Sequence, residues 1–246
     1  MLEKIFAIQG EADFNQACLA TYEFQKKHTE IYSRYLKALG KYDLPVTDYR
    51  EIPFLPVEFY KSQDVISQGQ IAETVFSSSG TTGMITSKHP VVNLALYEQS
   101  FRRAFTQFYG PVEDIAILAL LPSYLERNGS SLIYMVDDLI KHSQQAESDY
   151  FLYNHDELLA KLISLKAKGT KTLLIGVTYA LLDFTEKYAL NFPELIVMET
   201  GGMKGKRKEM IRQELHSLLK AGFGVEHIHS EYGMTELLSQ GYSNGD

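Results

Sequence analysis

The sequence predicts an α/β fold in which a mostly parallel sheet is flanked by helices. From about residue 70 onward, short apolar runs alternate with longer segments of helical periodicity. Strands that alternate with helices form parallel sheets, because each parallel crossover needs a long connection. The runs at 115–121 and 172–177 are apolar at nearly every position, which is typical of strands buried on both faces.

The expected elements follow one another in regular order. Strands are expected at 73–76, 115–121, 150–153, 172–177, 195–198 and 225–229. Helices are expected at 93–108, 130–142, 156–168, 179–190 and 204–221. Gly169 and Gly222 stand near the ends of two of these segments, where glycine commonly terminates a helix.

A helical segment precedes this alternating part. Apolar residues recur at helical spacing from 13 to 39, with Asp13 as candidate N-cap and Gly40 as a stop signal. Three prolines between 42 and 57 exclude a regular helix and predict an extended connector. We therefore expect a helical segment and connector over 1–50 and an α/β domain over 51–246.

Composition excludes several classes of protein. The formal net charge is -7 and the pI is about 5.5, which argues against general binding to nucleic acid because phosphate neutralisation needs a basic surface. No apolar run approaches the roughly 20 residues of a membrane span, and the N-terminus lacks the apolar stretch of a signal peptide. The single cysteine, Cys18, permits no internal disulfide. These features predict a cytoplasmic protein.

The segment 77–83, Ser-Ser-Ser-Gly-Thr-Thr-Gly, follows an expected strand. Phosphate oxygens are best met by short hydroxyl donors and by backbone N–H groups that no Cβ obstructs. The segment lacks the Gly-Lys-Ser/Thr ending of a P-loop. On composition alone, a phosphate-binding loop and a flexible surface turn are about equally favoured.

A second segment, Ser230–Glu236, follows the strand expected at 225–229. Open α/β sheets bind ligands at the carboxyl ends of their strands. There Tyr232 could stack on a purine, Thr235 could donate to a phosphate, and Glu236 could hold Mg²⁺. The alternative is a short helix capped by Ser230, with solvated carboxylates.

Taken in order, Ser-Gly-Thr-Thr-Gly and, about 150 residues later, Tyr-Gly-Met-Thr-Glu resemble the motifs of the adenylate-forming enzymes, which include acyl-CoA synthetases and luciferase. The sequence is most similar to the acyl-protein synthetase (LuxE-like) branch. Three further stretches resemble that branch, at 52–57, 121–127 and 199–205.

The resemblance implies an enzyme that uses ATP and Mg²⁺ to convert a carboxylic acid, in this branch a fatty acid, into an acyl-adenylate. The acyl group then passes to the thiol of an acceptor protein or of CoA. The implied cofactor contacts are Ser78, Ser79, Gly80, Thr81, Thr82 and Gly83 at the phosphates, and Gly201, Gly202 and Tyr232 at adenine. Thr235 would meet the α-phosphate, and Glu236 would bind the metal.

Lys88 departs from the superfamily pattern. The superfamily places a lysine three residues after the last glycine of its loop, whereas Lys88 follows Gly83 by five residues. It is a candidate phosphate contact, although an exposed and solvated lysine is the more common state.

Arg127, Ser130 and Ser131 are candidates for binding the acid. They precede a helix, and the free N–H groups of a helix start suit a carboxylate. The alternative is an ordinary capped helix with Asn128 or Ser130 as its cap, and capping preference favours this account.

Family members continue beyond the point that corresponds to Asp246, with a ribose-binding aspartate, a hinge and a mobile domain that carries a lysine. We therefore expect an incomplete adenylation domain, with weak nucleotide binding and without complete adenylation. Two rival functions stay open, a phenylacetate-type acyl-CoA ligase and a non-catalytic domain that binds a nucleotide or a partner subunit.

Two polar clusters have weaker functional interpretations. Lys204, Lys206, Arg207 and Lys208 crowd an expected helix start, where cations oppose the helix dipole and hint at a nearby anion. A solvated charged face is the commoner explanation. His227 and His229 alternate on an expected strand and would allow a metal site only with further ligands.

Overall fold

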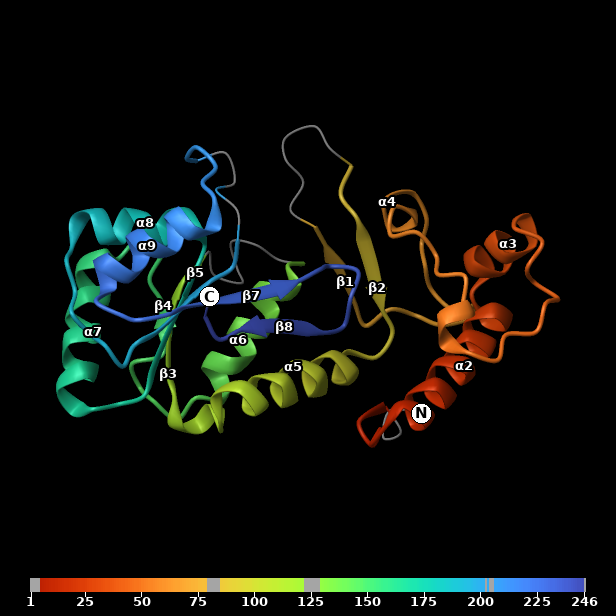
Figure 1. The fold of residues 1–246 in the computed structure, drawn as a ribbon, viewed down its shortest axis with the longest axis horizontal. Helices are drawn as coiled ribbons and strands as arrows, with labels where there is room; N and C mark the ends of the chain where they lie inside the picture. Colours follow the sequence, from red (N-terminus) through yellow and green to blue (C-terminus); the bar gives the residue numbers. More distant parts are fainter. Residues whose placement is uncertain (1–4, 79–84, 122–128, 202, 204–205, 246) are drawn as a thin grey trace. The chain divides into compact units, whose positions relative to one another are not determined.

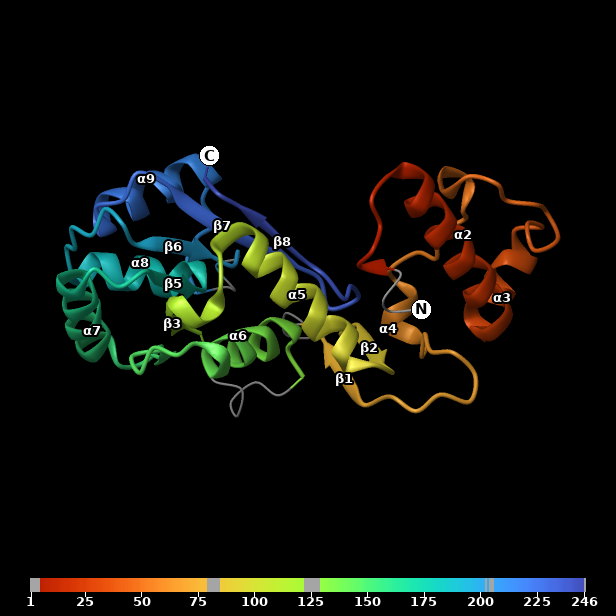
Figure 2. The ribbon, with the colours of Figure 1, turned by 90° about the horizontal axis from the view of Figure 1, so that it is seen from below.

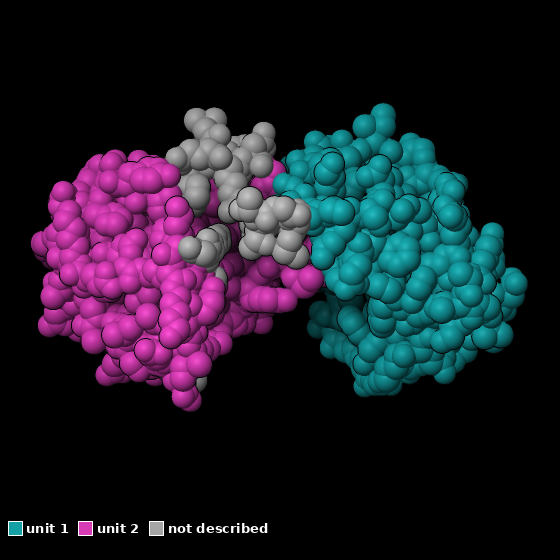
Figure 3. All heavy atoms as spheres, turned by 90° about the horizontal axis from the view of Figure 1, so that it is seen from above, with its two compact units in different colours: residues 1–96 teal, residues 97–246 magenta. Residues whose placement is uncertain are grey.

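The computed structural model describes residues 5–78, 85–121, 129–201, 203 and 206–245. Contacts divide the chain into two compact units, Met1–Leu96 and Tyr97–Asp246 (Figure 3). The dividing point differs from the boundary at residue 50 that the sequence suggested. An adenylation domain over 51–246 stays a prediction.

The prediction of a single helix over 13–39 is wrong, because two helices occupy this region. These are α2 (Glu11–His28) and α3 (Glu30–Ala38), separated by Thr29 in an extended conformation with φ -107° and ψ 103°. The backbone N–H of Gln68 donates to the carbonyl of His28 at 2.7 Å, and the rings of Tyr22 and Tyr32 meet edge to face. Tertiary contacts thus compete with the helical pattern at the break.

The ends of these helices differ partly from expectation. Gly10, not Asp13, is the N-cap of α2, and the Asp13 carboxylate accepts a hydrogen bond from the backbone N–H of Gln9 at 3.1 Å. Asp13 therefore stabilises the helix start from inside the first turn. Gly40, with φ +65°, follows α3 as expected and donates its N–H to Lys37.

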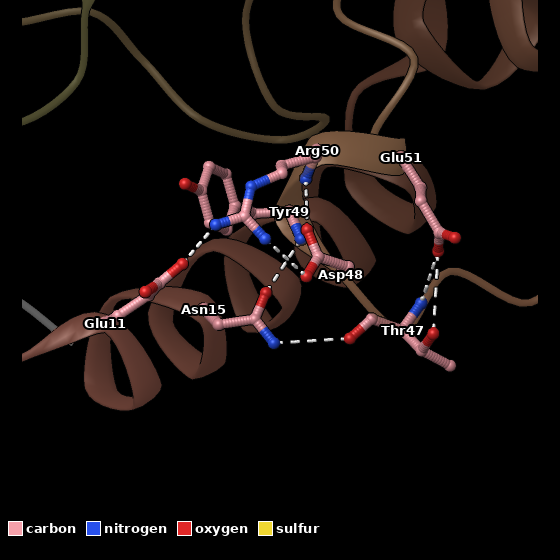
Figure 4. Close-up of polar contacts among 7 residues, drawn as sticks. All are labelled: Glu11, Asn15, Thr47, Asp48, Tyr49, Arg50 and Glu51. Atoms are coloured by element: carbon pink, nitrogen blue, oxygen red, sulfur yellow. Dashed lines mark hydrogen bonds and ion pairs between the residues drawn. The ribbon is translucent and has the colours of Figure 1, made fainter.

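The proline-containing connector is pinned to α2 by side chains (Figure 4). Asn15 donates to the carbonyl of Thr47 at 3.2 Å and accepts from the backbone N–H of Tyr49 at 2.7 Å. Arg50 forms ion pairs with Glu11 and Asp48. The connector contains one 3-10 turn, η1 (Tyr49–Glu51), and leads to the short helix α4 (Phe59–Ser62).

The first unit has its own apolar core and ends in a two-stranded sheet. Tyr22, Tyr32 and Leu36 form the centre of the core, which Ile52 and Leu55 of the connector help to cover. The sheet pairs β1 (Thr74–Ser77) with β2 (Lys88–Val91) in antiparallel register. The sequence predicted β1 but missed β2, because Pro90 interrupts the strand pattern and lowers its strand propensity.

The second unit contains a six-stranded sheet in the order β4–β3–β5–β6–β7–β8. Neighbouring strands are parallel throughout, except that β8 is antiparallel to β7. The α/β class with a mostly parallel sheet is thereby confirmed. The strands are β3 (Ala116–Leu120), β4 (Asp149–Tyr150), β5 (Thr172–Gly176), β6 (Ile196–Glu199), β7 (Ile228–Gly233) and β8 (Gln240–Ser243).

Helices cover both faces of this sheet (Figures 1 and 2). On one face α6 packs against β3, and the opposite face carries α8 and α9. Phe184 of α8 contacts both His155 of α7 and Phe223 of α9. The helices are α5 (Leu94–Tyr109), α6 (Ser131–His142), α7 (His155–Lys168), α8 (Thr178–Lys187) and α9 (Arg212–Phe223), with a 3-10 turn, η2 (Val112–Asp114), before β3.

The strands β3 and β5 form the centre of the core. Every residue of both is buried, as their uninterrupted apolar runs predicted. Within the described part of the chain, no helix is long and apolar enough to cross a membrane.

Three boundaries near the C-terminus are corrected by the structure. The strand expected at 225–229 begins at Ile228 and continues to Gly233, and the helix expected from residue 204 begins only at Arg212. Gly224, with φ +68°, caps α9 in place of Gly222. Gly222 lies inside the helix, where a Cβ would collide with Thr185 of α8, so close helix packing explains this glycine.

Candidate functional site

The strand order identifies one edge of the sheet as the place for a ligand. From β3 the chain crosses to β4 on one side, and then passes from β5 through β6 to β7 on the other. This reversal produces a topological switch point between β3 and β5. Doubly wound α/β proteins bind ligands outside the carboxyl ends of the strands at such a point.

A polar row crosses the carboxyl edge of the sheet on the face that carries α8 and α9. Gly176 of β5 pairs with Glu199 of β6, Glu199 pairs with Ser230 of β7, and Ser230 pairs with Ser243 of β8. Arg212, at the start of α9, donates to the hydroxyl groups of Ser230 at 3.0 Å and Ser243 at 3.4 Å. Polar groups of three neighbouring strands are therefore gathered at this edge.

Glu199 is the buried member of this row, with 8% of its surface exposed. Its carboxylate accepts a hydrogen bond from the backbone N–H of Gly201 at 2.6 Å and one from the hydroxyl of Thr178 at 3.4 Å. The other carboxylate oxygen lies 3.9 Å from Nε2 of His216. Three elements, the turn after β6 and the helices α8 and α9, thus meet at one carboxylate.

The predicted adenine-side residue Gly201 lies in the short segment Thr200–Gly201 directly after β6, here named the Gly201 turn. Its φ of +74° is a left-handed conformation that favours glycine. The preceding residue, Thr200, donates its backbone N–H to the carbonyl of Gly176 at 3.1 Å. This turn is therefore held to β5 through the backbone and to Glu199 through a side chain.

The second predicted loop is part of a β-hairpin. The structure contradicts both of the forms expected for Ser230–Glu236, because Ser230 to Gly233 belong to strand β7. Thr235 and Glu236 lie in the turn that joins β7 to β8, where the N–H of Leu237 donates to the carbonyl of Met234. Pairing with β8 satisfies the backbone that a loop or a short helix would otherwise have to satisfy.

Tyr232 lies on this hairpin with 65% of its surface exposed, so its ring is accessible to a ligand. Close packing explains why the adjacent position 233 is a glycine. A Cβ there would collide with the side chains of Gln240 and Glu231.

The predicted acid-binding residues Ser130 and Ser131 lie at the start of α6. The hydroxyl of Ser130 accepts a hydrogen bond from the backbone N–H of Ile133 at 3.4 Å, so the capping role is confirmed for Ser130. Ser131 is buried, and its carbonyl accepts from the hydroxyl of Tyr97 at 3.0 Å. A role of either serine in acid binding stays a prediction.

Tyr97 connects this helix start to the hairpin. The side-chain amide of Gln240 in β8 donates to the Tyr97 hydroxyl at 2.5 Å, while that hydroxyl donates to Ser131. Burial is the main cause that raises the pKa of Tyr97 well above its ordinary value. The hydroxyl therefore stays protonated and can serve as the donor to Ser131 throughout the neutral range.

We expect Tyr97→Phe to lower the free energy of unfolding of the second unit by about 1–3 kcal/mol, because it leaves buried polar partners unsatisfied. Denaturation in urea, followed by far-ultraviolet circular dichroism, measures the loss. Amide exchange in 240–243 should rise more than in β3. The control is Tyr153→Phe, whose ring is 75% exposed, with an expected change within about 0.5 kcal/mol. Equal stability of the two variants would contradict a structural role for this hydroxyl.

The remaining candidates lie in the first unit or outside the described residues. The backbone N–H of Ser78 donates to Ser87 at 3.1 Å, and the Ser78 hydroxyl accepts from the N–H of Ser87 at 2.9 Å. Lys88 begins β2 and is exposed. The predicted phosphate, adenine and acid contacts that lie outside the described residues are Ser79, Gly80, Thr81, Thr82, Gly83, Gly202 and Arg127.

For one member of the basic cluster, Arg207, ion pairs with α8 explain the position. The guanidinium of Arg207 donates to Asp183 at 2.9 Å and to Glu186 at 2.6 Å, and these carboxylates raise its pKa. The anion near this cluster is therefore supplied by α8. Lys206 and Arg207 also precede the helix rather than forming its first turn.

His227 and His229 belong to no group of potential metal ligands among the described residues. His229 contacts the hydroxyl of Tyr109 through Nδ1 at 3.2 Å, and burial lowers its pKa. Among the residues that the structure describes, no group of three potential ligands could hold a metal ion.

No family model, curated protein or solved structure matches this chain.

Sequence reasoning missed Glu199, Tyr97 and Gln240. Glu199 stands at the end of an apolar run, and an acidic residue that directly follows a buried strand is a signal that could have found it. Tyr97 and Gln240 carry no such signal. They are 143 residues apart, and only the folded chain brings them together.

Proposed function

We propose that this chain is part of an ATP-dependent enzyme that activates a carboxylic acid, fatty in the branch that it resembles. The acid carboxylate attacks the α-phosphorus of ATP, the bond to pyrophosphate breaks, and an acyl-adenylate forms. The acyl group then passes to the thiol of an acceptor protein or of CoA. Such chemistry demands mainly positioning and neutralisation of charge from the protein.

One observation supports this proposal above the others. Gly201 and Tyr232, which the resemblance assigns to adenine, stand two residues beyond the paired positions Glu199 and Ser230. Gly201 follows the end of β6, and Tyr232 lies in β7 beyond its last residue paired with β6, so both lie at the same edge of these neighbouring parallel strands. This edge also receives the start of α8, where ligands of doubly wound folds bind.

The start of α6 supports the acid side of the proposal. Ser131 is joined through Tyr97 to Gln240 on the hairpin that carries Tyr232. A helix start offers backbone N–H groups that suit a carboxylate. In this proposal the acid would lie near α6 and adenine near the hairpin, with Thr235 and Glu236 serving the α-phosphate and Mg²⁺.

Equilibrium binding of ATP in the presence of Mg²⁺, measured by calorimetry, tests the proposal. We expect Tyr232→Ala to weaken ATP binding by about tenfold, since stacking of one base on an aromatic ring is worth about 1–3 kcal/mol. Tyr153→Ala, which removes an exposed tyrosine elsewhere, should leave the affinity unchanged. Absence of adenine-nucleotide binding by the unaltered chain would sink the proposal.

Product formation separates the rival functions. Pyrophosphate release with ATP and a panel of fatty and aromatic acids reports acid activation, and hydroxylamine trapping reports the acyl-adenylate. Thioester formation on CoA would favour a phenylacetate-type ligase, and thioester formation on a protein cysteine would favour an acyl-protein synthetase. Nucleotide binding without pyrophosphate release fits both an incomplete adenylation domain and a non-catalytic binding domain.

A further inference from the structure

The burial of Glu199 is energetically unfavourable for a charged side chain. It ends a strand whose preceding residues, Val197 and Met198, are fully buried, and only 8% of its own surface is exposed. A buried carboxylate is tolerated when hydrogen bonds replace its lost hydration. Its partners therefore indicate what this residue does.

The shortest contact of Glu199 is with the turn that follows its own strand. Oε2 accepts from the N–H of Gly201 at 2.6 Å, and hydrogen bonds to an ionised carboxylate are shorter and stronger than those between neutral groups. The same oxygen accepts from the hydroxyl of Thr178 at the start of α8. The carboxylate thus fixes the turn relative to the first residue of a helix.

The backbone fixes the other side of this turn. The N–H of Thr200 donates to the carbonyl of Gly176 in β5. At Gly176 itself, a Cβ would approach Leu120 and Leu181 to 2.9 Å, so α8 is packed closely over this strand end. The Gly201 turn is consequently held between β5 on one side and the Glu199 carboxylate on the other.

We infer that Glu199 is a positioning residue that sets the location of the Gly201 turn, and through it one wall of the adenine-nucleotide site. The identity of the nucleotide rests on the proposed function. Glu199 acts through the Gly201 backbone and does not itself touch the ligand. A turn held in its binding conformation avoids the cost of ordering when the ligand binds.

Residue-resolved amide exchange of the full chain tests the positioning role directly. Glu199→Ala should increase exchange at Gly201 by about tenfold or more, because a hydrogen bond to a charged acceptor is lost. Glu199→Gln keeps a side-chain oxygen and should stay close to the original rate. The matched control is Glu194→Ala, which removes an exposed carboxylate just before the same strand and should change nothing at Gly201.

A second variant guards against failure of the alanine variant to fold. Glu199→Met keeps the side-chain volume but carries no oxygen acceptor for the Gly201 N–H, so it should behave like alanine at Gly201 and unlike glutamine. A purely structural role predicts a different result. Exchange would then rise equally in β5 and β6, and the rise would be larger in variants with a lower melting temperature. Unchanged exchange at Gly201 in folded alanine and methionine variants would overturn the inference.

ATP affinity completes the test. Folded Glu199→Ala or Glu199→Met should bind ATP with Mg²⁺ about tenfold more weakly, and Glu199→Gln should restore most of the affinity. Equal affinity in all variants would overturn the role at the nucleotide site. If the unaltered chain binds no ATP while Gly201 exchange responds as expected, the proposed function fails and the positioning of the turn stands.

Discussion

Phe184→Ala should lower the free energy of unfolding of the second unit by about 3–5 kcal/mol, the usual cost of removing a buried aromatic ring. Phe184 is fully buried in α8. Its ring stacks on Phe223 of α9 with centroids 5.7 Å apart, and it meets His155 of α7 edge to face at 5.8 Å. The substitution therefore leaves a cavity where three helices join.

Urea denaturation followed by tyrosine fluorescence measures this loss, since the chain has 16 tyrosines and no tryptophan. Tyr153→Ala removes an aromatic ring that is 75% exposed and should cost less than about 0.5 kcal/mol. A loss below about 1 kcal/mol for Phe184→Ala would contradict the packing of α7, α8 and α9 around this ring.

Gly224→Val should destabilise the second unit by about 3–5 kcal/mol through two additive causes. The φ of +68° at Gly224 costs a side chain about 1–2 kcal/mol, and more for a β-branched one. A Cβ there would also lie 2.7 Å from the Cα of Asn191. Overpacking against backbone, which cannot rotate away, typically adds about 1–3 kcal/mol.

Gly169→Val is the matched control for this change. Gly169 also caps a helix of the same unit, with φ +66°, but a Cβ at this position meets no atom within 4 Å. Calorimetric melting of both variants separates the two causes, because the difference between them reports the collision alone. Equal losses would show that backbone strain accounts for the whole effect and would refute the close approach to Asn191.

Local signals in the sequence determined much of the fold. The apolar runs that became β3 and β5 could be recognised because burial on both faces leaves no polar position in a strand. Gly169 was predicted correctly as a helix end, because a left-handed C-cap selects glycine whatever surrounds it. The parallel arrangement followed from the alternation of strands and helices, which is a property of the chain order.

Signals that have two possible causes could not be resolved from the sequence. Gly222 and Gly224 both suit a helix end, and only the proximity of Thr185 to Gly222 shows that this glycine serves close packing. The segment Ser230–Glu236 was predicted to be a loop or a short helix because Ser and Gly favour turns and caps. Its first four residues form a strand because β8 pairs with them, and β8 has no apolar pattern of its own.

Some residues of the candidate site could likewise be predicted from the sequence, and others could be found only in the structure. The family resemblance pointed to Gly201 and Tyr232, and the position of Tyr232 after an expected strand agreed with it. The free N–H groups of an expected helix start pointed to Ser130 and Ser131. Only the tertiary structure gave the strand order that creates the switch point, and only it placed Glu199 against Gly201 and Tyr97 against Gln240. The physical reason is that strand register and long-range hydrogen bonds depend on which elements become neighbours in space. Hydrophobic periodicity shows which face of an element is buried, but it does not identify the element that packs against that face.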